Sequence, residues 1–408
     1  MELIDKAYEQ AVLTVEKCMD TVGVKASALS GGYNQIWARD SMITFLGASL
    51  IEREAFNDSF KNSLETLARH QTGLGYIPLN VEAGSEKVYS HNNGGVDSNA
   101  WYIIGHKVLY DRYRDPDFLR KHLSSIKKAV LWLNYQDSND CGLIEVHEAA
   151  DWADLIANRG NVLYDNVLYY KALTEYAHIL TLCGEAGDIY LAKAADVRDK
   201  INLLLWPGDV EEKTALLREK GYCEEWLHIV RGSGELFWFG NFYLPYVSFR
   251  DFGYHCDALG NSLAILYGVA DEKQAGTILD YFIQTGMNQP YPVMALYPPI
   301  MPGEKDWREY YRNAHLNLPY QYHNGGVWPF VGGFYIAALI KAGRKTQGER
   351  ELESLARANQ AGRQSEWEFN EWLHSQSGMP AGAMYQAWSA GMYIYAYHCV
   401  KNGLPDGI

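Results

Sequence analysis

Apolar residues recur every three to four positions along most of the chain, and strict alternation of apolar and polar residues is rare. This spacing gathers apolar side chains on one face of a helix, so it predicts helices rather than strands. About twelve segments show the pattern. They are residues 3–20, 40–54, 56–71, 96–112, 116–134, 162–183, 189–205, 256–267, 272–284, 327–342, 344–370 and 383–401. Residues 206–254 lack a good helical period, so a hairpin or a long non-helical excursion is expected there.

The connectors between these helices alternate in character. Those after even-numbered helices are short, such as EREAF, YRDPD and KAGRK, whereas those after odd-numbered helices are long and rich in Trp, Tyr, Asn, Asp, His and Gly. If the helices run alternately up and down, every long connector lies at the same end. We therefore predict an all-α (α/α)6 toroid, with an inner and an outer ring of helices and the functional loops around one mouth. No linker or shift in composition divides the chain, so residues 1–408 are expected to form one domain.

The composition narrows the classes of partner. The chain has 408 residues and a formal net charge of −14, which argues against nucleic acid and anionic membranes because both attract basic patches. The N-terminus is amphipathic rather than a signal peptide, and no apolar run reaches the roughly 18 residues of a membrane span. The six cysteines are scattered without a CxxC pair, which fits free thiols in the cytoplasm and gives no support for a metal site.

Acidic residues in two long connectors are the candidates for chemistry. Glycoside hydrolysis needs two carboxyl groups, one on each side of the scissile bond. The segment HEAADWADLIANRG supplies Glu148, Asp151 and Asp154, although either aspartate could instead cap the next helix or pair with Arg159. The segment FNEWLHSQSG supplies Glu371, which could also be a solvated loop residue. Its neighbours Glu366 and Glu368 are expected to be solvated.

Other polar residues of the long connectors could bind a ligand. Arg39 and Asp40 stand side by side in IWARD, where Asp40 could grip sugar hydroxyls or serve as a helix cap. Asp97 in VDSNAW has the same two interpretations. His323 and Asn324 precede two glycines in YHNGG, which would bring the backbone close to a ligand. The 30 tyrosines and 12 tryptophans either pack in a large core or stack on sugar rings.

In this order, the motifs resemble those of (α/α)6 glycoside hydrolases, and most closely those of the alkaline/neutral invertase family. The segments that carry the resemblance are YNQIWARD, VDSNAWYI, YVSFRDFGYHCDALGNSLAIL, YHNGGVWP and NEWLHSQSGMPAGAMYQAWSA, within residues 33–388. The resemblance implies that Glu371 is the catalytic base and Asp154 the acid, with Asp151 as the alternate acid. The substrate-binding residues it implies are Tyr33, Gln35, Trp37, Arg39, Asp40, Asp97, Trp152, Asp257, Tyr322, His323, Asn324, Trp328, Gln386 and Trp388.

One departure from the family lies beside the acid. Invertases carry Arg-Arg-Met-Gly after it, whereas this chain has Leu-Ile-Ala-Asn at residues 155–158 and resembles glycogen-debranching amylo-α-1,6-glucosidases there. We expect an inverting hydrolase without cofactor or metal, with a small carbohydrate as its partner; whether it forms a homo-oligomer is open. Sucrose is the leading substrate, and a short α-1,6-linked or compatible-solute glucoside is the second choice. Two further classes of protein fit the same toroid, a sugar epimerase or isomerase and a non-catalytic carbohydrate-binding relative.

Overall fold

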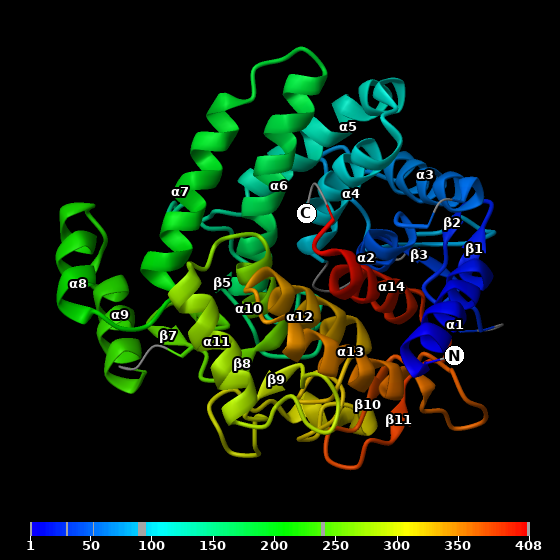
Figure 1. The fold of residues 1–408 in the computed structure, drawn as a ribbon. Coiled ribbons are helices and arrows are strands. Elements are labelled where there is room, and N and C mark those ends of the chain that lie inside the picture. The colour runs from blue at the N-terminus through cyan, green and yellow to red at the C-terminus, as the bar shows by residue number, and fades with distance from the viewer. Residues whose placement is uncertain (1, 30–31, 52, 89–94, 238–240, 406–408) are drawn as a thin grey trace.

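The computed structural model of the protein describes residues 2–29, 32–51, 53–88, 95–237 and 241–405 (Figure 1). All twelve predicted helices are present, and they form an inner and an outer ring. The inner helices are α2 (Ala38–Ala48), α4 (Asp97–Tyr113), α6 (Leu163–Leu182), α10 (Ala258–Leu266), α12 (Pro329–Lys341) and α14 (Ala387–Asn402). The outer helices are α1 (Leu3–Cys18), α3 (Glu54–Arg69), α5 (Pro116–Asn134), α7 (Asp188–Leu204), α11 (Glu272–Gln284) and α13 (Lys345–Gln360). The prediction of an (α/α)6 toroid is confirmed.

The inner helices close into a circle. Each contacts the next, in the order α2, α4, α6, α10, α12, α14 and back to α2. Every residue of α2 and α10 is buried, which is typical of helices that are enclosed on all sides. Helices α2 and α14 approach so closely that a Cβ on Gly47 would lie 1.8 Å from the carbonyl oxygen of Gly391. Only glycine allows the circle to close at this point.

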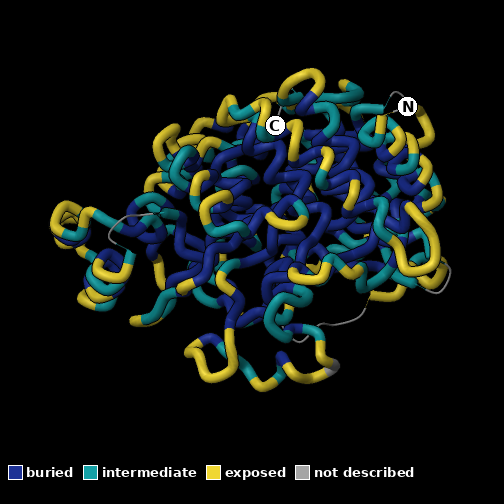
Figure 2. Tube along the Cα trace, turned by 60° about the horizontal axis from the view of Figure 1, so that its bottom comes forward, coloured by how far each residue is buried: buried dark blue, intermediate teal, exposed yellow. Residues whose placement is uncertain are grey.

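The outer helices cover the circle with one apolar face each. In α3, for example, Phe56, Phe60 and Leu64 recur every four residues and are buried, while the opposite face is polar. Helix α5 begins at Pro116 because the Asp115 side chain accepts a hydrogen bond from the backbone N–H of Phe118. The central layer is therefore buried and the periphery exposed (Figure 2).

One helix is shorter than predicted. Residues 361–370 were expected to continue α13, but the helix ends at Gln360. The Glu368 carboxylate accepts hydrogen bonds from the backbone N–H groups of residues 363–365, at 2.7–2.9 Å, and this folds the segment into a loop. Glu368 is fully buried, so the expectation that it is solvated was wrong.

Residues 206–254 also differ from the prediction. They contain α8 (Val210–Glu219) and α9 (Glu224–Leu236), so the expectation of a non-helical excursion was wrong for this part. Helices α8 and α9 project from the side of the toroid (Figure 1). A hairpin of β6 (Tyr246–Ser248) and β7 (Asp251–Phe252) follows them. Lys213 of α8 donates hydrogen bonds to the carbonyls of Asn202 and Leu203, at 2.9 and 3.1 Å, and so anchors α8 to the end of α7.

Short backbone pairings join the six long connectors into a circle around the mouth, which we call the connector ring. Each pairing lies at or near the entrance to an inner helix, and together they tie every long connector to the next. The pairings are β3 (Gln35–Trp37) with β4 (Asn80–Glu82), the N–H of Val96 with the carbonyl of Ala150, β5 (Asn161–Val162) with β6, β8 (Cys256–Asp257) with β9 (Leu296–Tyr297), Val327 with Leu373, and Gln386 with Ser27. Two local hairpins, β1 (Met19–Asp20) with β2 (Gly23–Val24) and β10 (Trp372–Leu373) with β11 (Pro380–Ala381), complete the strands.

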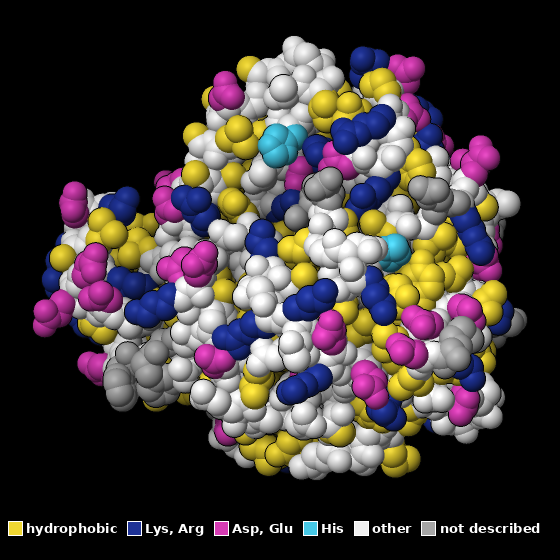
Figure 3. Space-filling model, viewed as in Figure 1, with side chains coloured by type: hydrophobic (Ala, Val, Ile, Leu, Met, Phe, Trp, Pro, Cys, Tyr) yellow, Lys and Arg dark blue, Asp and Glu magenta, His cyan; other side chains and the backbone are white. Residues whose placement is uncertain are grey.

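The surface of the molecule carries both signs of charge. On the face seen in Figure 3, Lys and Arg side chains are interspersed with Asp and Glu. Within the described part of the chain, no helix is long and apolar enough to cross a membrane. All six cysteines are unpaired.

Candidate active site

A pocket opens inside the connector ring, with an empty volume of about 390 Å³. Twelve residues line it, all of them among the sequence-predicted candidates. Nine come from four of the six long connectors, and three come from the first turns of α2 and α14. The twelve are Tyr33, Trp37, Arg39, Asp40, Trp152, Asp154, Tyr322, His323, Trp328, Glu371, Gln386 and Trp388. Residues 30–31, 89–94 and 238–240, in three of the long connectors, lie outside the described residues.

Aromatic rings form one wall of the pocket. Trp152 contacts His323 and Trp328 edge-on, at centroid distances of 5.1 and 5.6 Å. Trp328 stacks on His323 at 4.9 Å and meets Trp388 edge-on at 5.8 Å. These contacts fix the orientation of each ring. The result is a rigid aromatic wall whose four rings are almost fully buried.

Arg39 is held by a buried ion pair under the pocket. Its Nη1 donates to Oδ2 of Asp97 at 2.7 Å, and the hydroxyl of Tyr164 donates to the same oxygen at 2.9 Å. Asp97 is therefore a counterion for Arg39 beneath the pocket rather than a lining residue. Beside Arg39, burial raises the pKa of Asp40 to about 6.

Replacing Arg39 with Ala is expected to lower the free energy of unfolding by about 3–5 kcal/mol, because it leaves Asp97 charged, buried and without its partner. Thermal and urea unfolding measure this. The matched control is Arg357→Ala, which breaks the exposed pair with Glu353 and should change stability by less than about 1 kcal/mol. Equal effects of the two changes would contradict the structural role of Arg39.

Asp154 is the carboxylate of its connector that reaches the pocket. Its side chain keeps 45% of its surface exposed, toward the pocket, and its Oδ1 lies 3.8 Å from Nδ1 of His323. Desolvation raises the pKa of Asp154; the positive charge of Arg39 opposes this rise, and the negative charge of Asp97 adds to it. Burial keeps His323 neutral by lowering its pKa well below the usual value. Asp154 therefore faces a ligand with its proton held more tightly than in a free aspartate.

Asp151 does not reach the pocket. Its Oδ1 accepts the backbone N–H of Ala153 at 2.7 Å and its Oδ2 accepts Nδ2 of Asn158 at 3.2 Å. These bonds close the turn that presents Asp154. Burial raises the pKa of Asp151 to about 7, but the residue is only 3% exposed. Glu148, the third acid of this connector, forms a two-point ion pair with Arg308 at 2.8 and 2.9 Å.

Glu371 lines the pocket from the α13–α14 connector. Its Oε2 accepts the backbone N–H of Ala383 at 2.9 Å, which fixes the carboxylate. Burial raises its pKa to about 7, and the negative charges of Asp40 and Asp154 act in the same direction. Tyr33 faces the same carboxylate and opposes the rise. A carboxylate with a pKa near neutrality is suited to take up a proton during a reaction.

Several buried polar atoms at the pocket have no hydrogen-bond partner among the described residues. They are Nε of Arg39, Nδ1 of His323, Nε2 of Gln386 and Nε1 of Trp388. Buried polar groups are normally satisfied, because an unpaired one costs free energy. Most of these atoms are donors, so the pocket matches a ligand with many oxygen acceptors.

Three other candidates lie outside the lining. Asp257 caps α10, accepting the backbone N–H groups of Leu259 and Gly260 at 3.0 and 3.2 Å. Asn324 is fully buried, and its amide pairs with both backbone groups of Ile300. Gln35 lies in β3 of the connector ring. These three residues shape the surrounding loops and do not line the pocket.

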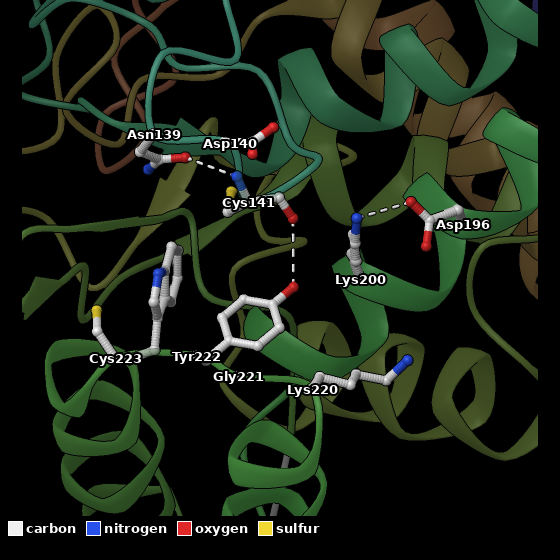
Figure 4. A pocket seen from close by; sticks show the side chains of 10 residues that line it. Asn139, Asp140, Cys141, Asp196, Lys200, Lys220, Gly221, Tyr222 and Cys223 are labelled. Atoms are coloured by element: carbon white, nitrogen blue, oxygen red, sulfur yellow. Dashed lines mark hydrogen bonds and ion pairs between the residues drawn. The ribbon is translucent and has the colours of Figure 1, made fainter.

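Another hollow lies outside the ring, between α7, α9 and the start of the α5–α6 connector (Figure 4). Its empty volume of about 940 Å³ exceeds that of the mouth pocket. Its polar groups bond to one another: the Tyr222 hydroxyl donates to the Cys141 carbonyl at 3.2 Å, and Lys200 pairs with Asp196 at 2.7 Å. Its carboxylates are Asp140 and Asp196, and Asp196 is held by Lys200. In the described part of the chain, no group of three or more His, Cys, Asp or Glu could hold a metal ion.

Residues 223–403 match the family of alkaline and neutral invertases. Over 164 residues the chain is 29% identical to neutral/alkaline invertase 1, mitochondrial, of Oryza sativa subsp. japonica, covering 38% of this chain and 24% of that protein. Over 167 residues it is 30% identical to alkaline/neutral invertase E, chloroplastic, of Arabidopsis thaliana, covering 40% and 25%. The matched segment thus spans about a quarter of these invertases' length. Glu371 lies within the family match, whereas Asp154 does not.

Solved structures share the fold along nearly the whole chain. The GH63 mannosylglycerate hydrolase of Thermus thermophilus, in complex with glucose, superposes with a TM-score of 0.68 at 13% identity, covering 95% of this chain and 99% of that one. A bacterial glucoamylase complexed with acarbose gives a TM-score of 0.66 at 15% identity, covering 98% and 56%. The toroid is therefore the fold of these glycosidases.

Proposed function

We propose that the protein is an inverting glycoside hydrolase that acts on small glucosides, with sucrose as the leading substrate. The observation that carries this proposal is the pair of carboxyl groups, Asp154 and Glu371, in one narrow pocket with an aromatic wall. Their connectors enter α6 and α14, which are opposite one another in the inner circle. The two carboxyl groups thus approach a bound sugar from two sides.

The reaction assigns one proton transfer to each group. Asp154 donates its proton to the glycosidic oxygen as the bond from that oxygen to the anomeric carbon breaks. Glu371 takes a proton from a water molecule whose oxygen attacks the anomeric carbon from the opposite face. The products are a free sugar of inverted configuration and the alcohol that carried it. Inversion requires roughly 6.5–9.5 Å between the carboxyl groups, so that the water fits.

The family match over residues 223–403 supports sucrose as the first substrate to test. The acid connector supports a second candidate, an α-glucoside such as a short α-1,6-linked stub or a glucosylated compatible solute. Its residues 155–158 lack the Arg-Arg-Met-Gly of invertases, and Ile156 and Ala157 are buried there. Asp154 would then still be the proton donor, and only the leaving group of the substrate would differ.

Product analysis tests the proposal directly. The protein is incubated with sucrose, isomaltose, trehalose or glucosylglycerate, and proton NMR follows the first minutes. We expect one substrate to release β-glucose before mutarotation. Sucrose and glucosylglycerate each contain a single glucose, so its release from them as the α anomer would contradict the inverting mechanism. Interconversion of free sugars would indicate an epimerase, and binding of sugars without turnover would indicate a carbohydrate-binding relative.

The dependence of kcat/KM on pH should be bell-shaped, because the active form carries a protonated Asp154 and an ionised Glu371. One limb should lie near pH 7, where Glu371 titrates. Asp40→Asn removes a negative charge that raises the pKa of Glu371, so it should move this limb to lower pH. The measurement is the pH at which this limb lies, and the maximum value of kcat/KM is not used. A limb that stays in place would show that Glu371 does not set it.

A further inference from the structure

The connector that carries Asp154 is held from outside by two side chains of the α11–α12 connector. The backbone N–H of Ala157 donates to the hydroxyl of Tyr311 at 2.8 Å. Nδ2 of Asn317 donates to the carbonyl oxygen of Leu155 at 2.9 Å. The two bonds are made one and three residues after Asp154. They fix the side of the turn that Asp151 does not hold.

Both side chains are themselves fixed. Asn317 is fully buried, and its Oδ1 accepts the backbone N–H of Asn324 at 3.2 Å. Nδ2 of Asn324 in turn donates to the carbonyl of Asn317 at 3.0 Å. Asn324 directly follows His323, which lines the pocket beside Asp154. Asn317 thus couples the two segments that carry Asp154 and His323.

Tyr311 is 1% exposed and lies between two rings of its own segment. Trp307 and Tyr310 contact it edge-on, at centroid distances of 5.3 and 5.1 Å. Its ring is therefore immobilised, and its hydroxyl presents a fixed acceptor to the backbone after Asp154. The short 3-10 helix η1 (Glu309–His315) carries both tyrosines.

We propose that Tyr311 and Asn317 are positioning residues that hold the general acid in register with the glycosidic oxygen; this rests on the proposed function. Nδ1 of the neutral His323 lies 3.8 Å from Oδ1 of Asp154, which is too far for a hydrogen bond that would fix the carboxyl group. The place of this carboxyl group therefore depends on its backbone. A displacement of about 1 Å at a reacting group can cost about a hundredfold in rate. Tyr311 and Asn317, which are distant in the sequence, hold the backbone of residues 155–158, where this chain departs from the invertase motif.

The test compares leaving groups. Loss of acid catalysis matters for an oxygen leaving group, which needs the proton of Asp154 as the bond breaks. It matters little for α-D-glucosyl fluoride, because fluoride departs as an anion while water adds to the anomeric carbon and gives its proton to Glu371. The variant is Tyr311→Phe, which removes one oxygen and keeps the ring. We expect it to lower kcat/KM by about 10–100-fold on the O-glucoside that the protein hydrolyses, and by less than about threefold on the fluoride.

The matched control is Tyr310→Phe. It removes the neighbouring hydroxyl, which bonds to Glu148 at 3.0 Å and not to the turn after Asp154. Both rates should stay within about twofold of the unmodified protein, since this bond is partly exposed. In addition, Tyr311→Phe should cause no further loss on the O-glucoside when it is added to Asp154→Asn, because residues that act through one group are not additive.

Each result that differs from these expectations overturns a specific part of the proposal. Equal losses on O-glucoside and fluoride, or full additivity with Asp154→Asn, would show a general structural role and overturn the positioning proposal. Asn317→Ala must reproduce the selective loss, and it replaces Tyr311→Phe if that variant unfolds. If Asp154→Asn itself spares the O-glucoside, the assignment of the acid in the proposed function fails instead.

Discussion

Replacing Glu371 with Gln will lower kcat by about 10²–10⁴-fold, because a carboxamide cannot take the proton of the attacking water. The fold should survive, since the amide oxygen can still accept the N–H of Ala383. Steady-state kinetics on the substrate identified by product analysis measures the loss, and thermal unfolding checks the fold. KM should change little, because the side chain keeps its size.

The control for this result lies three residues away. Glu368 is fully buried but faces backbone N–H groups of residues 363–365 rather than the pocket. Glu368→Gln should therefore lower the melting temperature, since an amide offers one oxygen where the carboxylate uses two, and it should leave kcat within about tenfold. A kcat for Glu371→Gln near that of the unmodified protein would remove Glu371 from the mechanism.

Asp154→Asn should cause the second large loss, also about 10²–10⁴-fold in kcat/KM on an O-glucoside, because the amide has no proton to give. The Asp154 side chain faces the pocket and is 45% exposed, so the melting temperature should stay almost constant. The same kinetic and thermal measurements apply. Stability and activity should thus separate at this residue.

Asp151→Asn should lower stability more than Asp154→Asn does, and activity less. The two carboxylate oxygens of Asp151 accept hydrogen bonds from the backbone N–H of Ala153 and from Nδ2 of Asn158. An asparagine would place its NH2 group against one of these two donors. We expect a loss of about 1–3 kcal/mol in stability and a smaller loss of activity than for Asp154→Asn. If Asp151→Asn were instead the more damaging change for catalysis and the less damaging one for stability, the roles of the two aspartates would be exchanged.

The helices were predictable where their ends depend on local residues. Helix α5 begins and ends where its pattern indicated, because Asp115 and Pro116 specify its start. Helix α11 does so as well, because Asp271 and Gln274 form a capping box. The end of α13 was missed because residues beyond it fold around the buried Glu368, and periodicity carries no sign of that. Helix α8 was missed because only Thr214 and Leu217 of its ten residues are buried, which gives a weak helical period. Helix α9 was missed because Gly232 and Gly234 interrupt its pattern.

The pocket was predictable from motifs to a large extent, since each motif residue lies in a connector that the toroid brings to the mouth. Two candidates lie outside the lining for one physical reason. Asp257 and Asn324 stand in the same motifs as the lining residues, but their side chains turn to backbone groups of Gly260 and Ile300. Sequence does not tell which way a polar side chain turns. Tyr311 and Asn317 stand in no motif, because their partners lie about 160 positions away in the chain.

The connector ring separates two parts of each long loop. Three pocket residues lie within two positions of a pairing of the connector ring: Arg39 follows β3, Trp328 follows Val327, and Glu371 precedes Leu373. The tips beyond the pairings are exposed, as at residues 301–304. Insertions or exchanges at such tips should leave the reacting groups in register. Evolution, or a designer grafting loops from a relative, can then alter which molecules are admitted while the bond-breaking chemistry stays the same.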